Sequence, residues 1–169
     1  MRIIPSRAAV DAWCGCRTTV YQRIAGILAP VIYAGLFLLI ALRWRHLPER
    51  IPTPYDFTGN VNGWGSRWTL LILPAVGLLT DVAMAVSLRF PRSWNAGVKI
   101  TVFNKARVYR VLRDFIADMR LAMAFVFAFI SVWMLRGPGT LPGWALTAVT
   151  LGLTILPLIR YIIRLIRAK

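Results

Sequence analysis

Four long apolar runs alternate with polar segments along this chain. The runs cover residues 24–42, 68–88, 121–135 and 144–159. The fourth run continues past Arg160 to residue 163. A helix needs about 20 mostly apolar residues to cross the ~30 Å hydrocarbon core of a bilayer, and each run fits or nearly fits one crossing. Because unpaired backbone groups are too costly in lipid, the pattern predicts an all-α integral membrane bundle of four transmembrane helices.

Proline interrupts three of the runs, at Pro30, Pro74 and Pro157. In a membrane bundle the neighbouring helices can satisfy the freed carbonyl groups, so we expect kinks rather than breaks. The first run is longer than the apolar region of a signal peptide, and the basic segment 43–45 follows it instead of a small-residue cleavage site. We therefore interpret the first run as a retained helix.

The segment before the third run, residues 104–120, has an amphipathic pattern. Apolar residues recur there at helical spacing, while Arg110, Asp114 and Asp118 lie four apart on the other face, where local ion pairs are favourable. If this segment continues into the third run, one helix extends from about residue 104 to 135, roughly 48 Å. Such an extension either lies on or rises from the membrane surface, or docks a cytoplasmic regulator.

The chain is both very apolar and very basic. Of its 169 residues, 58% are hydrophobic, and the mean hydropathy is +0.63. The chain has 21 Lys and Arg but only 6 Asp and Glu, which gives a net charge of +15. Sixteen of the 21 basic residues lie in the N-terminal piece, the second connection and the C-terminal piece. The positive-inside rule then predicts that both termini are cytoplasmic (N-in/C-in). Because topology next to anionic lipid accounts for the charge, we expect a lipid bilayer and no nucleic acid as the partner.

These assignments predict one membrane domain with two short tails. The cytoplasmic N-terminal tail covers residues 1–23, the four-helix domain 24–163 and the basic cytoplasmic C-terminus 164–169. Within the domain, the outer loop covers 43–67, and the cytoplasmic loop with the amphipathic helix covers 89–120. Small residues four apart are candidates for close helix packing, within this chain or in a homo-oligomer. These candidates are Ala25/Ala29, Ala83/Ser87, Ala124/Ala128 and Ala148/Gly152.

Proline and glycine are concentrated in the outer loop, which has no clear helical or strand periodicity. Such residues restrict or permit particular turns, so the loop is expected to be a defined cap rather than a flexible tether. A large aromatic face in the loop is suited to ligand contact. The candidate cap or ligand-contact residues are Pro48, Ile51, Pro52, Asp56, Gly59, Gly63, Trp64, Gly65 and Ser66.

The loop resembles the signature of a bacterial membrane family of unknown function related to the SdpI immunity proteins. The matching positions are Leu47-Pro48, Ile51-Pro52, Gly59 and Gly63-Trp64-Gly65-Ser66. The resemblance extends over about residues 24 to 135 and implies toxin immunity or signalling. Pro54, Asn62 and Arg67 stand where the family pattern has His, Asp and Lys. These departures weaken a metal, proton or charge-recognition role for the loop and leave a structural role intact.

Asp81 is the one acidic residue inside an apolar run. Intramembrane carboxylates are costly and are often functional. Two interpretations are open: a structural ion pair with Arg120, or a place on an ion or proton pathway.

No set of residues predicts an enzyme, a cofactor or a metal centre. Cys14 and Cys16 supply at most half of a zinc site, so reduced thiols are expected, with S-acylation as an alternative. His46 is the single histidine, and a headgroup contact is the simplest role for it.

The sequence therefore favours a non-enzymatic multi-pass protein of the bacterial inner membrane, which gives immunity to a peptide toxin or senses an envelope signal. A small transporter or transporter subunit is one alternative, and a membrane scaffold or assembly component is another.

Overall fold

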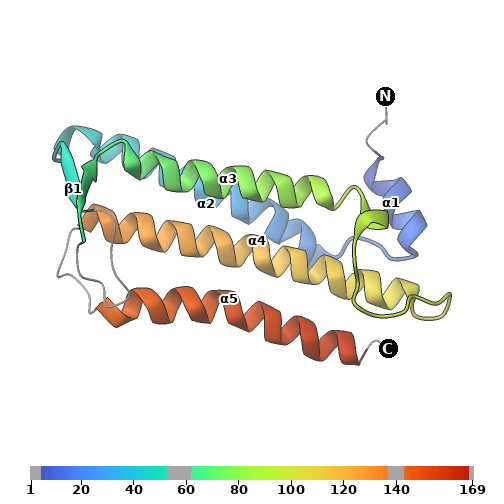
Figure 1. Cartoon of the computed structure of the whole chain (residues 1–169). Coiled ribbons are helices and arrows are strands. Elements are labelled where there is room, and N and C mark those ends of the chain that lie inside the picture. Colours follow the sequence, from blue (N-terminus) through green and yellow to red (C-terminus); the bar gives the residue numbers. More distant parts are fainter. Residues whose placement is uncertain (1–4, 53–61, 137–142, 168–169) are drawn as a thin grey trace.

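The protein is a bundle of helices with one short hairpin, seen in a computed structural model that describes residues 5–52, 62–136 and 143–167 (Figure 1). The helices are α1 (Arg7–Cys14), α2 (Val20–Arg43), α3 (Thr69–Ser87), α4 (Lys105–Arg136) and α5 (Gly143–Ile166). Two 3₁₀ turns, η1 (Trp44–His46) and η2 (Pro91–Ser93), and two strands, β1 (Arg50–Pro52) and β2 (Trp64–Ser66), complete the described elements. The prediction of an all-α fold is confirmed.

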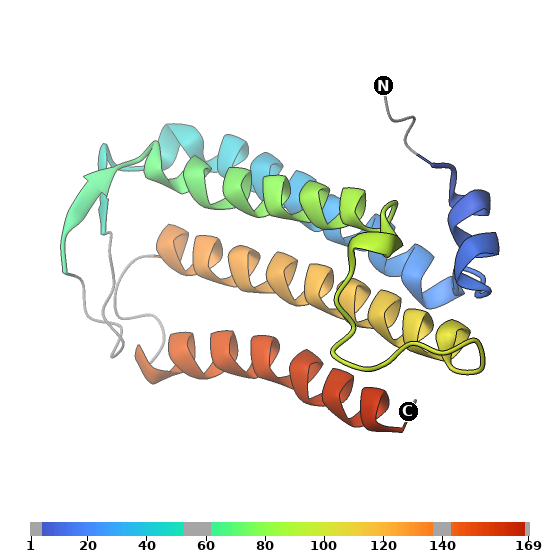
Figure 2. The ribbon, with the colours of Figure 1, turned by 45° about the vertical axis from the view of Figure 1, so that its right-hand side comes forward.

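The four long helices lie side by side, with the hairpin at one end and α1 at the other (Figures 1 and 2). We call these the hairpin end and the termini end, because α1 and the C-terminal end of α5 both lie at the end opposite the hairpin. Each of the four helices is long and apolar enough to cross a membrane. Together they indicate a multi-pass membrane protein.

Helix α4 is the centre of the bundle, because it contacts α1, α2, α3 and α5. Its 32 residues form one continuous helix, so the amphipathic segment 104–120 and the third apolar run are a single element, as their pattern suggested. At 1.5 Å per residue, α4 is about 48 Å long. The extension packs within the bundle and places its polar side chains against the four other helices.

Small residues allow α2, α3 and α4 to approach closely in the middle of the bundle. Ala29 and Ala124 are fully buried beside Tyr33. A Cβ atom added at Gly77 would lie 2.6 Å from the Tyr33 ring and 2.7 Å from Phe127, so only glycine fits there. By contrast, two predicted packing positions, Ala83 on α3 and Ala148 on α5, are exposed. Those two predictions are wrong within this monomer.

The N-terminal segment is more structured than the predicted tail. Ser6 caps α1 by accepting a hydrogen bond from the Ala9 amide, and Gly15 ends the helix in the left-handed region with φ 68°. Helix α2 begins at Val20 rather than at residue 24, because Thr19 and Gln22 form a reciprocal capping box. A four-residue capping signal of this kind extends a helix beyond its apolar run.

The outer loop contains a strand pair that its sequence did not predict. Strands β1 and β2 are antiparallel, with Arg50 opposite Ser66, Ile51 opposite Gly65 and Pro52 opposite Trp64. Ile51 is 2% exposed and packs with Leu70 and Met134. Three residues are too short for an alternating pattern to be recognised in the sequence, and burial of Ile51 against the helices holds the hairpin in place.

Candidate functional site

The predicted intramembrane pair of Asp81 and Arg120 is present. Arg120 Nε donates to Asp81 Oδ1 at 2.6 Å and Nη2 donates to Oδ2 at 2.9 Å. The Arg120 side chain is 8% exposed and the Asp81 side chain is 3% exposed. A buried carboxylate held through both oxygens has its charge balanced in place, as a structural pair requires. This geometry matches the interpretation of Asp81 as a pairing residue that joins α3 to α4.

A second ion pair fixes α1 on α4. Arg113 Nη2 donates to Asp11 Oδ1 at 2.6 Å, and Arg113 Nη1 donates to the Cys16 carbonyl at 3.1 Å. The Thr18 amide and hydroxyl also donate to the Asp11 carboxylate. Burial alone would raise the pKa of Asp11, but the hydrogen bond and charge of Arg113, with Thr18, lower the pKa below its ordinary value of 3.8. Asp11 is therefore an anion that ties the N-terminal helix to the bundle.

The acidic side chains of the amphipathic segment pair across helices rather than locally. Asp114 accepts from Arg164 at 3.1 Å, and Asp118 pairs with Arg160 at 3.1 Å, so both acids bind α5. The expected local pairs with Arg110 are absent from the described residues, and Arg110 is exposed. The prediction was wrong because α5 offers arginines on the side of α4 that the bundle buries.

Helix α2 joins the same polar network. The Gln22 side-chain amide donates to Asp114 Oδ1 at 2.8 Å, and the Tyr21 hydroxyl donates to Asp118. Among the described residues, four acidic side chains thus bond to arginines on another helix. All four pairs include a residue of α4 between 113 and 120. We call these four ion pairs, with the bonds from Tyr21 and Gln22, the polar ladder. It holds the termini half of the bundle together.

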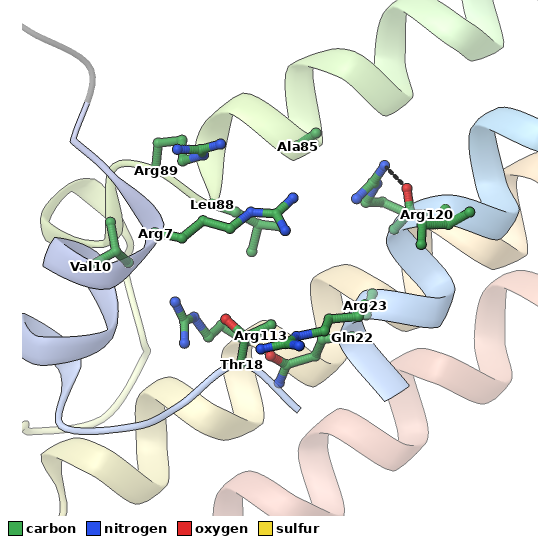
Figure 3. A pocket seen from close by; sticks show the side chains of 13 residues that line it. Arg7, Val10, Thr18, Gln22, Arg23, Ala85, Leu88, Arg89, Arg113 and Arg120 are labelled. Atoms are coloured by element: carbon green, nitrogen blue, oxygen red, sulfur yellow. Dashed lines mark hydrogen bonds between the residues drawn. The ribbon is translucent and has the colours of Figure 1, made fainter. Parts of the chain in front are cut away.

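Five arginines line a pocket of about 270 Å³ at the termini end, between α1, α2, α3 and α4. They are Arg7, Arg23, Arg89, Arg113 and Arg120. Figure 3 shows the Arg7 side chain extending into the middle of the pocket, with the other four arginines around it. The lining includes no acidic residue. The sequence did not predict this pocket, because its five arginines come from four separate helices or helix ends.

The charges of these five arginines are balanced to different degrees. Arg113 and Arg120 each have a carboxylate partner. Arg89 Nη1 donates to the Pro5 carbonyl at 3.2 Å, which leaves its charge uncompensated. Within the described ranges, the side chains of Arg7 and Arg23 have neither an ion pair nor a hydrogen bond. The pocket therefore carries three positive charges without a counter-ion.

The predicted cap residues take several different places in the structure. Ile51 is a core anchor, while Gly65 and Ser66 belong to the strand pair. Pro48 and Trp64 are exposed. Pro52 pairs in β1, and Gly63 directly precedes β2. Asp56 and Gly59 lie outside the described residues.

A hollow of about 540 Å³ lies beside the hairpin. It is lined by Glu49, Arg50 and the segment 64–68. Trp64 and Trp68 are 64% and 61% exposed, and Trp68 also stacks edge to face on Trp44 at 4.8 Å. This hollow combines aromatic faces with charges of both signs on a hairpin that is fixed to the bundle.

The two cysteines are buried, free thiols in the contact between α1 and α4. Burial, with Cys16 nearby, raises the pKa of Cys14 to about 11. A buried thiol of high pKa is a poor nucleophile and is closed to an acylating enzyme, which argues against S-acylation in this conformation. Among the residues that the structure describes, no group of three His, Cys, Asp or Glu side chains lies close enough to hold a metal ion.

One segment of the chain is similar to a known family. Residues 31–78 match a family described as Domain of unknown function (DUF1648). No curated protein and no solved structure matches the chain. The matched segment contains the hairpin-end part of α2, the hairpin and the first half of α3. The relation to the SdpI immunity proteins stays a prediction.

Proposed function

We propose that this chain is a non-enzymatic, multi-pass protein of the bacterial inner membrane, with both termini in the cytoplasm and the hairpin outside. An even number of crossings puts both termini on one side, and both lie at the end of the bundle opposite the hairpin. The arginine-lined pocket also lies at the termini end. Basic residues favour the cytoplasmic side, which supports this orientation.

The activity we propose is recognition of an external ligand at the hairpin, which gives immunity to a peptide toxin or reports an envelope signal. The observation that carries this proposal is the hollow beside the hairpin, where Trp64 and Trp68 expose most of their surface next to Arg50 and Glu49. Tryptophan and arginine are the residues most enriched at binding hot spots. The segment matched by the family of unknown function includes this hairpin, which agrees with a functional role there.

Helix α4 is the element we propose to connect the two ends. It carries Met134 under the hairpin and the polar ladder at the termini end. A ligand that shifts the hairpin would act on α4 through Ile51 and Met134. The exposed face of α4 around Arg110 would then contact a cytoplasmic regulator or anchor the bundle at the membrane surface.

Substitution of one exposed tryptophan tests the ligand site. Cells that lack the gene are complemented with the wild-type chain, Trp64→Ala or the matched control Trp144→Ala. Trp144 is 69% exposed and does not line the hollow. It lies in the first turn of α5, and this helix starts at the hairpin end (Figure 1). We expect Trp64→Ala to abolish protection against a secreted toxin or envelope stress, and Trp144→Ala to retain it at equal membrane levels. Unchanged sensitivity after gene deletion, or equal behaviour of the two variants, would contradict the proposal.

Cysteine labelling tests the orientation separately. In a Cys14→Ala, Cys16→Ala background, single cysteines replace the exposed Ser66 in the hairpin or the exposed Ser93 in η2. A membrane-impermeant maleimide is expected to label the first cysteine in intact cells and the second only after the membrane is opened. The opposite pattern would reverse the proposed topology.

Transport has less support as a function. Both carboxylate oxygens of Asp81 are occupied by Arg120, so Asp81 offers no open site to an ion. A flux into proteoliposomes that disappears in Asp81→Asn, with the folded state retained, would favour transport over ligand recognition.

A further inference from the structure

We propose that the pocket at the termini end binds a phosphate group, carried either by an anionic lipid headgroup or by a soluble phosphate compound. Arg7, Arg23 and Arg89 are the contacting residues, while Arg113 and Arg120 form the fixed wall behind them. This inference does not depend on the role proposed for the hairpin, which lies at the other end of the bundle.

The unbalanced charge of the pocket is the first argument. Five guanidinium groups line a space without any acidic residue, and in the described part of the chain only two of them have a carboxylate partner. Like charges in a partly enclosed space repel one another, and the pocket focuses a positive potential. A bound anion would relieve that repulsion. Arginine is the residue best suited to phosphate, since its planar fork matches two phosphate oxygens at once.

The second argument is that the arginines converge on one space with a buried back wall, even though Arg7 and Arg23 are themselves exposed. Arg7, Arg23 and Arg89 come from α1, α2 and the end of α3, yet they converge on one space (Figure 3). Helix α1 is held in place by the Asp11–Arg113 pair. Arg113 and Arg120 are themselves 6% exposed, so the back of the pocket is rigid.

Gly26 on α2 lies beside Arg120 in the lining of the pocket. A Cβ atom there would lie 3.4 Å from Arg120 Nη1, at the short limit of ordinary van der Waals contact. The Gly26 carbonyl accepts a hydrogen bond from Arg120 Nη2 at 3.5 Å, so the backbone of α2 helps to position Arg120 at the edge of the space.

The size and lining of the pocket define the ligand class. A volume of about 270 Å³ lies just below the ~300–1,000 Å³ range of ordinary small-molecule sites, which suits a headgroup or a small phosphate compound. Val10, Ile27, Ala85 and Leu88 supply apolar walls, and Ile27 is 67% exposed on the outside of α2. A lipid would thus place its phosphate among the arginines and its chains along the exposed face of α2.

Binding to the purified full chain tests the proposal. The chain in a neutral detergent at low salt is titrated with phosphatidylglycerol, with phosphatidylcholine as the lipid blank, and separately with inorganic pyrophosphate. Binding is followed by native mass spectrometry and by the shift of the thermal unfolding midpoint. The test variant is Arg7→Gln with Arg23→Gln. Its matched control is Arg107→Gln with Arg110→Gln, which removes two exposed charges from α4 at the same end.

We expect saturable binding of phosphatidylglycerol, pyrophosphate or both, because one charge-assisted hydrogen bond is worth about tenfold or more in affinity. The test variant is expected to bind at least tenfold more weakly, and the control within about twofold of wild type. Binding of the lipid alone assigns the phosphate to a lipid headgroup, and binding of pyrophosphate alone assigns it to a soluble compound. Competition between the two probes shows one shared phosphate site.

Two results would overturn the inference. One is the lack of saturable binding by either probe. The other is an equal loss of affinity in the test and control variants, which would indicate a general charge effect. Neither test residue has a side-chain partner in the described part of the chain, so folding should persist, as circular dichroism can verify. Arg23→Gln alone is the second variant if the pair does not fold, and unchanged binding in it would equally count against the site.

Discussion

Replacing Asp81 by asparagine separates charge from shape at the centre of the bundle. Asparagine has nearly the same volume but removes the negative charge that faces Arg120. Two short hydrogen bonds, at 2.6 and 2.9 Å, then lose their charged acceptor. The guanidinium retains the long contact to the Gly26 carbonyl at 3.5 Å as its other hydrogen bond.

The expected cost follows from burial. Both side chains of the pair are less than 10% exposed, and breaking such a pair on one side destabilises a protein by about 3–5 kcal/mol. Asp81→Asn should therefore lower the free energy of unfolding by that amount. The double variant with Arg120→Gln should lose less than the sum of the two single variants, because no unpaired charge remains buried.

The assay is reversible unfolding of the purified chain in mixed micelles with increasing SDS, followed by circular dichroism. Arg110→Gln is the control, since this exposed arginine lies on the same helix, and its effect should stay within about 0.5 kcal/mol. The reasoning is refuted if Asp81→Asn is as stable as this control, or if the two substitutions at the pair are simply additive.

Three further predictions concern packing, pH and thiol reactivity. Gly77→Ala should lower the free energy of unfolding by about 1–3 kcal/mol, because its new methyl group overpacks the site. Gly35→Ala is the control, since a Cβ atom at Gly35 would meet no atom within 4 Å. In the same SDS titration the control should be neutral or slightly stabilising. Because the folded state lowers the pKa of Asp11, its pair with Arg113 stabilises α1 at neutral pH. That contribution should be lost as the pH falls from about 3.8 through the lower folded-state pKa, seen as increased proteolysis of α1 by pepsin. Burial raises the pKa of Cys14 to about 11. Its thiol should therefore react with iodoacetamide at pH 8 at least about tenfold more slowly in the folded chain than in SDS. Mass spectrometry of the alkylated peptides measures both rates, and equal rates would disprove the burial of Cys14.

The long helices were predictable because apolar runs of membrane length leave few alternatives. The runs predicted α3 and α5 to within a few residues, and the amphipathic pattern before the third run was compatible with the continuous α4. The pairing of Asp81 with Arg120 was among the two interpretations, because an acid within an apolar run needs a partner. In these cases one strong physical constraint, the cost of exposing polar groups to lipid, leaves few possible structures.

Features that depend on three-dimensional convergence were not predictable. The partners of Asp114 and Asp118 depend on which face of α4 meets α5, and the spacing of Arg110 and the two acids along α4 does not reveal that face. Helix α1 is short and mixed in composition, so its docking through Asp11 leaves no periodic signal. The five-arginine pocket joins residues from four helices. Without an alignment or a fold, its arginines are indistinguishable from the other basic residues near the predicted membrane surface.

The hydrophobic cluster at the termini end has a consequence for biogenesis. It joins Val10 and Cys14 of α1 to Tyr109 of α4, with Tyr161 and Leu165 of α5 packed against it. These contacts span about 150 residues of sequence, so α1 leaves the ribosome long before its complete docking surface exists. The N-terminal helix therefore stays undocked until α4, which supplies Arg113 for its ion pair with Asp11, has been synthesised about 100 residues later.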